Sequence, residues 1–238
     1  MIKNIFKIIG IFILGIFGGI FGDQILWPYF VERPLFYQYR LEQSPVLVTE
    51  RKEIIIKENV ALKNAIGKVE KVVIGVKTET QKGKVLEGSG LIVTTDGLIV
   101  TLAELVPQGA KFSFFVEGEK VRYQILKRDL KENLALVKIE KTNLPTLSFA
   151  DLEKLKLGER VFLVGAIFKK EKMEKMVNEG LVKYFDQDLI ETNILEKNNL
   201  VGSVLFDIEG NILGINKIDP EGKIISLPVS KIRAFTGF

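Results

Sequence analysis

The sequence predicts an all-β domain, built as a sandwich or as a pair of barrels, behind an N-terminal membrane anchor and a short helix. About a dozen short apolar segments recur at roughly 8- to 12-residue spacing between turn residues, which is the pattern of such β domains. The chain is 47% hydrophobic and 27% charged, a balance typical of globular proteins. A long uncharged apolar run near the N-terminus departs from this pattern and predicts the anchor.

The apolar run is Ile8–Gly22, and it predicts a transmembrane helix. With Lys7 turned toward the lipid headgroups, residues 5–27 have about the 20 residues that a bilayer requires. Lys3 and Lys7 precede the run, so the positive-inside rule places the N-terminus in the cytoplasm and the rest of the chain outside it.

A cleaved signal peptide is the alternative to this anchor. The length of the apolar run fits a signal peptide, but Gly22–Asp23 is only a weak candidate for a cleavage site between small residues. We therefore expect a single-pass anchor in a bacterial-type cell membrane, with residues 5–27 in contact with lipid.

A linker and a helix follow the anchor. Residues 28–56 mix prolines, aromatic residues and charges, which is typical of a juxtamembrane linker. Apolar residues recur near helical spacing from Val60 to Val73, which predicts a helix, and Glu58–Asn59 can cap its N-terminus. The chain thus divides into the anchor at 1–27, the linker at 28–56, the short helix and first β half at 57–145, and the second β half with a C-terminal tail at 146–238.

Turn residues separate the expected strands. Asp96–Gly97 predicts a hairpin, and Glu209–Gly210 and Glu221–Gly222 predict further turns. Residues 144–159 separate the two halves, and the mixed charges of 168–176 predict a solvated loop. The expected strands cover 72–80, 88–95, 97–105, 111–116, 122–129 and 134–140 in the first half, and 160–168, 176–185, 189–195, 202–208, 211–216 and 223–229 in the second.

Composition excludes several kinds of site. The chain has no cysteine, which excludes disulfides and thiolate sites, and no histidine, which removes the commonest general base and metal ligand. The net charge of +4 comes from lysines spread among glutamates, so nucleic-acid binding is not supported. Asp186 and Asp188 fit a hairpin turn better than a cation site. We expect no metal and no cofactor.

Six fragments of the chain follow one another in an order that points to a family. GSGLIVTTDGLIVT (88–101) has a Gly-Ser-Gly start and an Asp-Gly hairpin, and RDLKENLALVKIE (128–140) and the segment 144–168 follow it. VNEGLVKYF, IETNIL and GSVLFDIEGNILGIN complete the series. Together they resemble the protease domain of the HtrA/Deg-type, trypsin-like serine proteases, from about Glu58 to about Arg233. The resemblance implies the chymotrypsin fold, which is a double six-stranded β-barrel.

The resemblance also assigns the positions of the catalytic triad. The histidine position falls on Glu104, and the aspartate position falls on Asn133. Counting back from Gly210 without a gap places the nucleophile position on Val201. A triad needs a hydroxyl, a base and a carboxylate that orients the base. Because none of these three residues supplies its part, we expect no catalytic residue.

Other side chains near these positions have alternative interpretations. Ser203 is a nucleophile only if the register slips by two residues and a base other than histidine serves it, such as a desolvated lysine. A small residue at a tight corner is the simpler interpretation. Glu104 is solvated at the barrel rim, acts as an acid/base group, or accepts a hydrogen bond from the amine of a bound peptide, and the solvated interpretation is the simplest. Ser89 lacks the spacing of a nucleophile elbow.

The resemblance further implies an oxyanion loop and a wall that binds peptides. The loop positions are Asn199, Leu200 and Val201, with Asn199 and Leu200 in place of the family's glycine and asparagine. In the family, a substrate peptide adds as a strand beside the second barrel, by a mode that needs backbone groups and pockets but no triad. The equivalent wall consists of Glu191, Thr192, Asn193, Ile194 and Leu195.

We therefore expect a membrane-anchored, extracytoplasmic pseudoprotease that binds an extended peptide or another envelope protein without cleaving it. The alternatives are an active serine endopeptidase with a non-standard site and a purely structural membrane protein. Because the sequence stops at Phe238, we expect no PDZ domain. Aromatic residues from Trp27 to Tyr39 suggest a homo-oligomer, a trimer by the family's example.

Overall fold

The computed structural model describes residues 2–27, 60–196 and 200–237. The chain divides into two compact units, Met1–Ile56 and Lys57–Phe238. The expected linker, the expected helix cap Glu58–Asn59 and the expected oxyanion-loop residue Asn199 lie outside the described residues.

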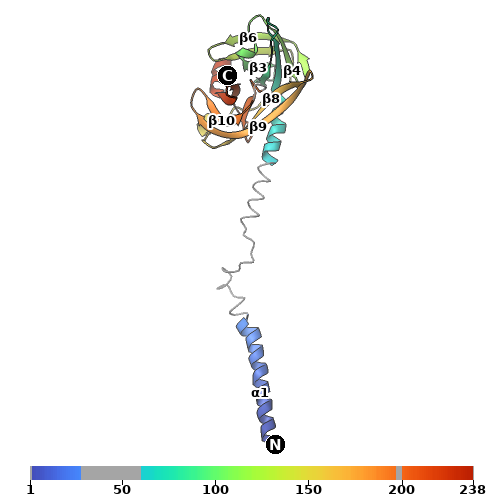
Figure 1. Cartoon of the computed structure of the whole chain (residues 1–238), viewed down its shortest axis with the longest axis vertical. Helices are drawn as coiled ribbons and strands as arrows, with labels where there is room; N and C mark the ends of the chain where they lie inside the picture. Colours follow the sequence, from blue (N-terminus) through green and yellow to red (C-terminus); the bar gives the residue numbers. More distant parts are fainter. Residues whose placement is uncertain (1, 28–59, 197–199, 238) are drawn as a thin grey trace. The chain divides into compact units, whose positions relative to one another are not determined.

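The N-terminal helix consists of α1 (Ile2–Phe21) and the π-helical turn η1 (Gly22–Leu26), drawn in blue in Figure 1. Its apolar segment, Asn4–Leu26, has 23 residues. At ~1.5 Å per residue this length reaches roughly 35 Å, which exceeds the ~30 Å hydrocarbon core of a bilayer. The segment is long and apolar enough to cross a membrane, a property that it would share with a signal sequence.

The expected short helix is present and leads into the β domain. It covers residues 60–69 and continues through the 3₁₀ turn η3 (Glu70–Val72) into β1 (Val73–Glu79). Val69 is fully buried, and a Cβ atom on Gly210 would stand 3.0 Å from its Cγ1. The helix therefore packs against the turn at Gly210 in the second half of the domain.

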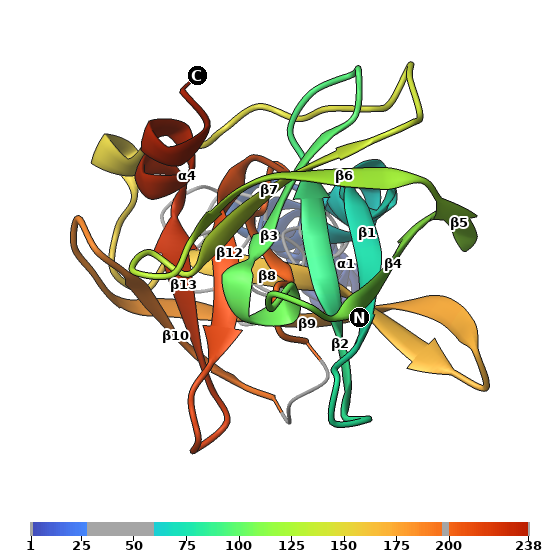
Figure 2. The same ribbon diagram turned by 90° about the horizontal axis from the view of Figure 1, so that it is seen from above.

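The first half is a single antiparallel sheet that curls into a nearly closed shape (Figure 2). Its strand order is β5-β4-β1-β2-β3-β7-β6, and β5 and β6 are separated along the chain by Arg122 alone. If β5 and β6 are counted as one strand bent at Arg122, the sheet has six strands and its two ends are joined through that bent strand. This curled sheet corresponds to the expected first barrel. The strands besides β1 are β2 (Val85–Ile92), β3 (Leu98–Leu102), β4 (Lys111–Val116), β5 (Glu119–Val121), β6 (Tyr123–Asp129) and β7 (Leu134–Ile139).

The second half is a closed six-stranded barrel with the order β10-β13-β12-β11-β8-β9. Together with the curled first sheet, this barrel confirms the predicted all-β double-barrel class. Its strands are β8 (Arg160–Lys169), β9 (Lys172–Phe185), β10 (Ile190–Leu195), β11 (Val204–Asp207), β12 (Ile212–Ile218) and β13 (Lys223–Pro228).

Two apolar clusters hold the domain together. The larger cluster joins the two halves, and there the rings of Phe162 and Phe206 stack at a centroid distance of 5.5 Å. The smaller cluster fills the second barrel and includes Leu163, Leu200 and Leu205. All of these side chains are fully buried, so the hydrophobic effect stabilises both the second barrel and its contact with the first half.

The segment 168–176, predicted as a solvated loop, is instead the tip of a long β8–β9 hairpin. Lys169 and Lys172 pair across a two-residue turn. The two turn residues, Lys170 and Glu171, have positive φ angles of 48° and 68°. This is the backbone of a type I′ turn, whose twist matches that of the flanking strands. The turn residues are Lys and Glu and not the Asn-Gly pair that usually marks such a turn, so the hairpin was not predicted from the sequence.

The hairpin tip packs on the first sheet. A Cβ atom on Gly75 of β1 would lie 2.7 Å from the sulfur of Met173, so only glycine leaves room for this side chain. The rings of Phe115 and Phe168 meet edge to face at 5.2 Å. These contacts explain why a segment rich in charges is ordered as strand.

Lys175 also connects the hairpin to the first sheet, because its ammonium donates a hydrogen bond to the backbone carbonyl of Val73. Burial lowers the pKa of Lys175 to about 8 from an ordinary value of 10.5, and the carboxylates of Glu70 and Glu117 oppose this shift more weakly. The hairpin therefore carries a cation that folding partly removes from water.

The C-terminal tail forms the helix α4 (Val229–Thr236). Ile232 and Phe235 are buried, and Gly237 ends the helix with φ of 83° and a hydrogen bond of 2.8 Å from its N–H to the Arg233 carbonyl.

Candidate functional site

The residues at the positions assigned to the histidine and the aspartate contact each other. Glu104 lies in the 3₁₀ turn η4 (Ala103–Leu105), and Asn133 precedes β7 with φ of 54°. The Glu104 N–H donates to Asn133 Oδ1, and Asn133 Nδ2 donates to Glu104 Oε1, both at 3.0 Å. The two side chains thus form a reciprocal pair, with Glu104 exposed and Asn133 half-buried.

The corner that carries the third position lies beside the same 3₁₀ turn. A Cβ atom on Gly88 would stand 2.6 Å from Leu105 Cδ1 and 2.6 Å from the Val201 carbonyl oxygen. Thr78 Oγ1 fixes the turn by donating to the Leu105 carbonyl at 2.6 Å. Glycine at position 88 therefore permits the close approach that gathers the three assigned positions on one side of the domain.

Residues 200–203 make a tight corner before β11. The N–H of Gly202, a residue with φ of 76°, donates to the Asn216 carbonyl at 2.8 Å, and the Ser203 N–H donates to the Leu200 carbonyl at 3.0 Å. The Val201 carbonyl accepts a hydrogen bond from the N–H of Ser89 at 2.9 Å. The side chain of Leu200 is fully buried in the apolar interior of the second barrel.

Ser203 is fully buried and belongs to a row of three polar side chains. Its hydroxyl oxygen accepts a hydrogen bond of 2.9 Å from Asn216 Nδ2, and the Ser226 hydroxyl donates to Asn216 Oδ1. An amide has no basic atom at neutral pH, so Asn216 cannot take a proton from Ser203. This geometry agrees with a structural serine at a corner.

Ser89 is likewise engaged in structural contacts. It is fully buried, and its hydroxyl oxygen accepts a hydrogen bond of 2.8 Å from the N–H of Ala166 in β8. Its carbonyl accepts a hydrogen bond of 2.7 Å from Thr101 Oγ1. Ser89 thus joins the first sheet to the second barrel.

The strand that the resemblance assigns as the peptide-binding wall has neighbouring strands over part of its length. β10 lies between β9 and β13 in the closed barrel. Glu191 is paired with Tyr184 on one side and with Ile225 on the other. The pairing with β9 ends at Thr192, so residues 193–195 have no strand partner in β9. The expectation of strand addition along residues 191–195 stays a prediction.

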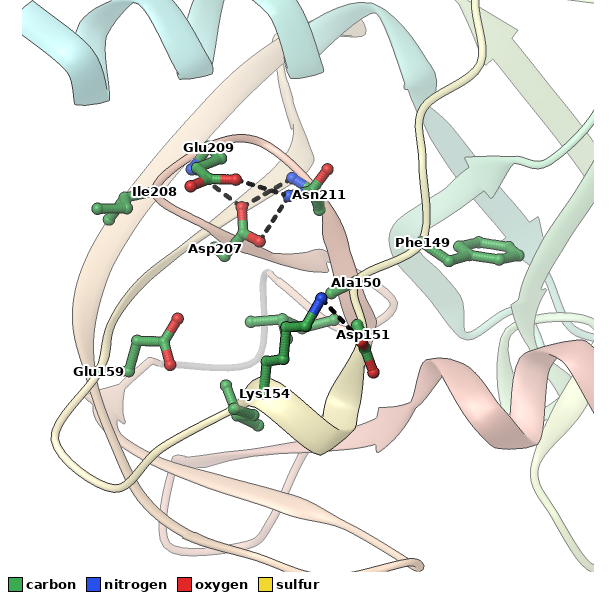
Figure 3. Close-up of a pocket in the computed structure, with 11 residues that line it drawn as sticks. Phe149, Ala150, Asp151, Lys154, Glu159, Asp207, Ile208, Glu209 and Asn211 are labelled. Carbon is green, nitrogen blue, oxygen red and sulfur yellow. Dashed lines mark hydrogen bonds and ion pairs between the residues drawn. The ribbon is translucent and has the colours of Figure 1, made fainter.

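A pocket of about 420 Å³ opens elsewhere on the second barrel (Figure 3). Asp207 in its wall accepts hydrogen bonds from the backbone N–H groups of Glu209 and Asn211 at 2.9 and 2.8 Å. Asp151 and Lys154 form an ion pair at 3.3 Å across another part of the wall. These polar groups satisfy one another, and the pocket includes none of the three assigned positions.

The residues that the structure describes contain no group of three or more Asp and Glu side chains placed to hold a metal ion. The expectation of no metal and no cofactor stays a prediction. The hydrogen bonds between Glu104 and Asn133 were not predicted from the sequence. The two residues are 29 positions apart, and no local sequence pattern indicates which residue either side chain contacts.

Comparison with known families gives a match over more than half of the chain. A family described as "Trypsin-like peptidase domain" matches residues 88–215. That range includes all three assigned positions, the corner at 200–203 and the β8–β9 hairpin.

Curated relatives resemble the chain over a similar part of its length. The "Probable periplasmic serine endoprotease DegP-like" of Halomonas elongata is 29% identical over 138 residues, which are 54% of this chain and 28% of that protein. Serine protease HTRA4 of Mus musculus is 32% identical over 164 residues, which are 62% of this chain and 33% of that protein. The chain thus spans about a third of the length of these relatives.

A solved structure of an HtrA-type protease with a tripeptide shares the fold. It superposes with a TM-score of 0.66 and 21% sequence identity, and the match covers 74% of this chain and 62% of that one.

Proposed function

Because the chain belongs to the trypsin-like peptidase domain family and is of HtrA type, we propose that it is a pseudoprotease, which keeps the family's fold as a binding module without cleaving peptide bonds. The observation that carries this proposal is the absence of histidine from all 238 residues. Serine hydrolysis in this family depends on an imidazole that takes the proton of the nucleophile and returns it to the leaving amine.

The side chains at the three assigned positions support the proposal. Val201 has no nucleophilic atom, and the only side-chain partner of Asn133 that the described residues supply is the carboxylate of Glu104. Ser203, the nearest hydroxyl along the chain, is buried and bonded to the amide of Asn216. Among the residues that the structure describes, Lys175 is the lysine whose pKa burial lowers, to about 8, and its ammonium bonds the Val73 carbonyl and not Ser203.

We further propose that the partner is an extended polypeptide or another envelope protein. The exposed Glu104 carboxylate, held in place by Asn133, is suited to accept a hydrogen bond from the amine of such a chain. Recognition would use side chains on the face around Glu104, and addition of a strand beside residues 191–195 stays part of the proposal, since residues 193–195 have no strand partner in β9.

The proposed location is a cell membrane of bacterial type, crossed once, with the N-terminus inside and the β domain outside. The segment Asn4–Leu26 supports a membrane span, and Lys3 before it supports the orientation. The similarity to a protein named as periplasmic agrees with a domain outside the cytoplasm.

A fluorophosphonate probe, which modifies activated serines covalently, tests the proposal on the full chain in detergent. We expect no labelling of the natural protein. The triple variant Glu104→His, Asn133→Asp and Val201→Ser serves as the matched control. Its introduced imidazole would stand where the Glu104 side chain now contacts residue 133, and we expect labelling at residue 201.

Labelling of the natural chain that is lost in Ser203→Ala would overturn the proposal in favour of an active endopeptidase with a non-standard site. Binding is tested separately by co-purification of the full chain from membranes after cross-linking, beside a Glu104→Ala variant. Recovery of no partner with either chain would favour the purely structural alternative.

A further inference from the structure

Lys231 in α4 connects the two halves of the domain through two ion pairs. Its ammonium lies 2.8 Å from Glu132 Oε2, in the turn between β6 and β7 of the first half. It also lies 2.9 Å from Asp188 Oδ1, in the turn between β9 and β10 of the second barrel. Hydrogen bonds to these two carboxylates raise the pKa of Lys231 above its ordinary value of 10.5. The lysine therefore joins the two turns as a cation at neutral pH.

The pair with Glu132 is the better shielded of the two. The side chains of Lys231 and Glu132 are 23% and 34% exposed, whereas that of Asp188 is 77% exposed. Water screens an exposed ion pair, so the contact with Glu132 is the stronger one. A cavity of about 340 Å³ opens between this turn and α4, with Asp129 and Phe235 in its wall. The ion pair, and not close packing, therefore connects the turn to the helix at this place.

The helix that carries Lys231 is firmly anchored. Val229 and Ile232 are 2% and 0% exposed, and both belong to the larger apolar cluster that joins the two halves. At the C-terminal end of the helix, Lys127 Nζ of β6 donates to the Phe235 carbonyl at 3.3 Å. The side chain of Lys231 thus extends from a fixed backbone.

The turn that α4 holds leads directly into Asn133. Its tip has little apolar support, since Leu130 is 81% exposed. The backbone N–H groups of Lys131 and Glu132 donate to Asp129 Oδ1 at 2.9 and 3.0 Å, which fixes the turn internally. The side chain of Glu132 then links the turn as a whole to α4.

Asn133 in turn determines where the Glu104 carboxylate stands. Its carbonyl accepts the Ala103 N–H at 3.0 Å, in addition to the two hydrogen bonds that its side chain forms with Glu104. Leu134, which follows it, is fully buried, so the chain can yield only on the side of Glu132. A rotation of the peptide between residues 132 and 133 changes the φ of Asn133, now 54°, and with it the direction of its side chain.

We propose that Lys231 is a positioning residue for the pair of Glu104 and Asn133, and that it acts through Glu132. By holding Glu132, it keeps Asn133 in the orientation that fixes the Glu104 carboxylate. This role rests on the proposed function, in which that carboxylate receives the amine of a bound chain. It adds that α4 and the second barrel control the geometry of a site that lies in the first half.

Hydrogen exchange of the full chain in detergent, with no partner added, tests this role. The N–H groups of Ala103 and Glu104 report on the pair, because both are bonded to Asn133. In Lys231→Met we expect these two amides to exchange on the order of five-fold faster than in the natural chain, while the amides of β8 keep their rates. Lys231→Arg keeps the cation, and we expect it to restore the natural rates.

Lys127→Met is the matched control, because it removes another lysine that bonds α4 and leaves Glu132 in place. Glu132→Gln removes the other partner of the contact, so we expect it to act as Lys231→Met does and the double variant to add nothing. Equal rates for the two reporting amides in Lys231→Met and Lys127→Met would overturn the proposal. A rise in Lys231→Met that the β8 amides share would also overturn it, since Lys231 would then have a structural role only.

The exchange experiment separates this role from the proposed function. Because no partner takes part in it, a chain that recovers no partner after cross-linking would count against the proposed function and would leave the exchange rates unchanged. Unaltered rates in Lys231→Met, beside a partner that the natural chain recovers, would refute the role of Lys231 alone.

Discussion

Gly202 shapes the corner at which the resemblance places the nucleophile. Its φ of 76° lies in the left-handed region, and an added Cβ atom would stand 2.3 Å from the Ser89 carbonyl oxygen. Gly83 has nearly the same φ, 75°, but nothing lies within 4 Å of its Cβ position. The two glycines therefore share a backbone conformation and differ in their surroundings.

We predict that Gly83→Ala destabilises the protein by about 1–2 kcal/mol, the ordinary penalty of an alanine in the left-handed region. Gly202→Ala adds the clash with a backbone atom, and we expect it to cost at least about 2 kcal/mol more. Thermal denaturation of the full chain followed by circular dichroism compares the two variants. Equal losses would show that the corner can shift to accommodate a side chain.

At the same scale, the sequence predicted the role of single residues where local rules apply. The turn role of Asp186 is confirmed, since its carboxylate accepts the backbone N–H groups of Asp188 and Leu189 at 2.7 and 2.9 Å. The partner of Ser203 was not predicted, although Asn216 is its neighbour in the adjacent strand of the β11–β12 hairpin, because the residue types alone do not fix the register that places the two side chains together.

The β8–β9 hairpin and the first sheet are held together in part by a half-buried lysine, Lys175, which makes the stability of their contact dependent on pH. Burial lowers the pKa of Lys175 to about 8 in the folded protein, whereas the unfolded chain keeps the ordinary value of 10.5. Below pH 8 both states carry the proton, and the folded state bears the full cost of the buried charge. Between pH 8 and 10.5 the unfolded state binds more protons, so this group makes the free energy of unfolding rise with pH.

We predict that the stability of the natural chain, relative to Lys175→Met, rises by an amount on the order of 3 kcal/mol from pH 8 to pH 10.5. Denaturant unfolding of both full chains at a series of pH values measures this difference. Lys172→Met, at an exposed lysine of the same strand, controls for the removal of one charge. A difference between the natural chain and Lys175→Met that stays constant over this pH range would contradict the prediction.

The elements with clear alternation were predictable, and those without it were not. The strand expected at 111–116 matches β4, because its apolar residues lie between marked turns. β5 was missed, since the three residues Glu119–Val121 are too few and too polar to give a pattern. The hairpin tip was missed for a different reason. Its mixed charges suggest solvent, but Met173 and Lys175 alternate toward the first sheet, which only the tertiary structure supplies.

For the whole molecule, the fold and the reaction depend on different residues. The apolar clusters and the joint between the halves, where Ser89 accepts a hydrogen bond from Ala166, do not use the side chains of Glu104 and Asn133. Val201 contributes its backbone carbonyl, which accepts the Ser89 N–H, and packs against the edge of the larger cluster. A trypsin-like fold can therefore remain stable while the groups that cut peptides are replaced. For this reason the double-barrel fold could be predicted from many glycine and turn positions, whereas the prediction of no catalytic residue depended on three single positions.

The orientation of the whole molecule in the membrane gives a last prediction. If Asn4–Leu26 spans the bilayer with Lys3 inside, the exposed turn residue Leu130 lies outside the cytoplasm. Since the chain has no cysteine, single thiols report accessibility without background. In spheroplasts, an impermeant maleimide should label Leu130→Cys directly and Asn4→Cys only after lysis. The labelled Leu130→Cys chain should retain the mass of residues 1–27. Loss of that mass would show that the segment is a cleaved signal peptide. Labelling of Asn4→Cys before lysis would show that the N-terminus lies outside, opposite to the proposed orientation.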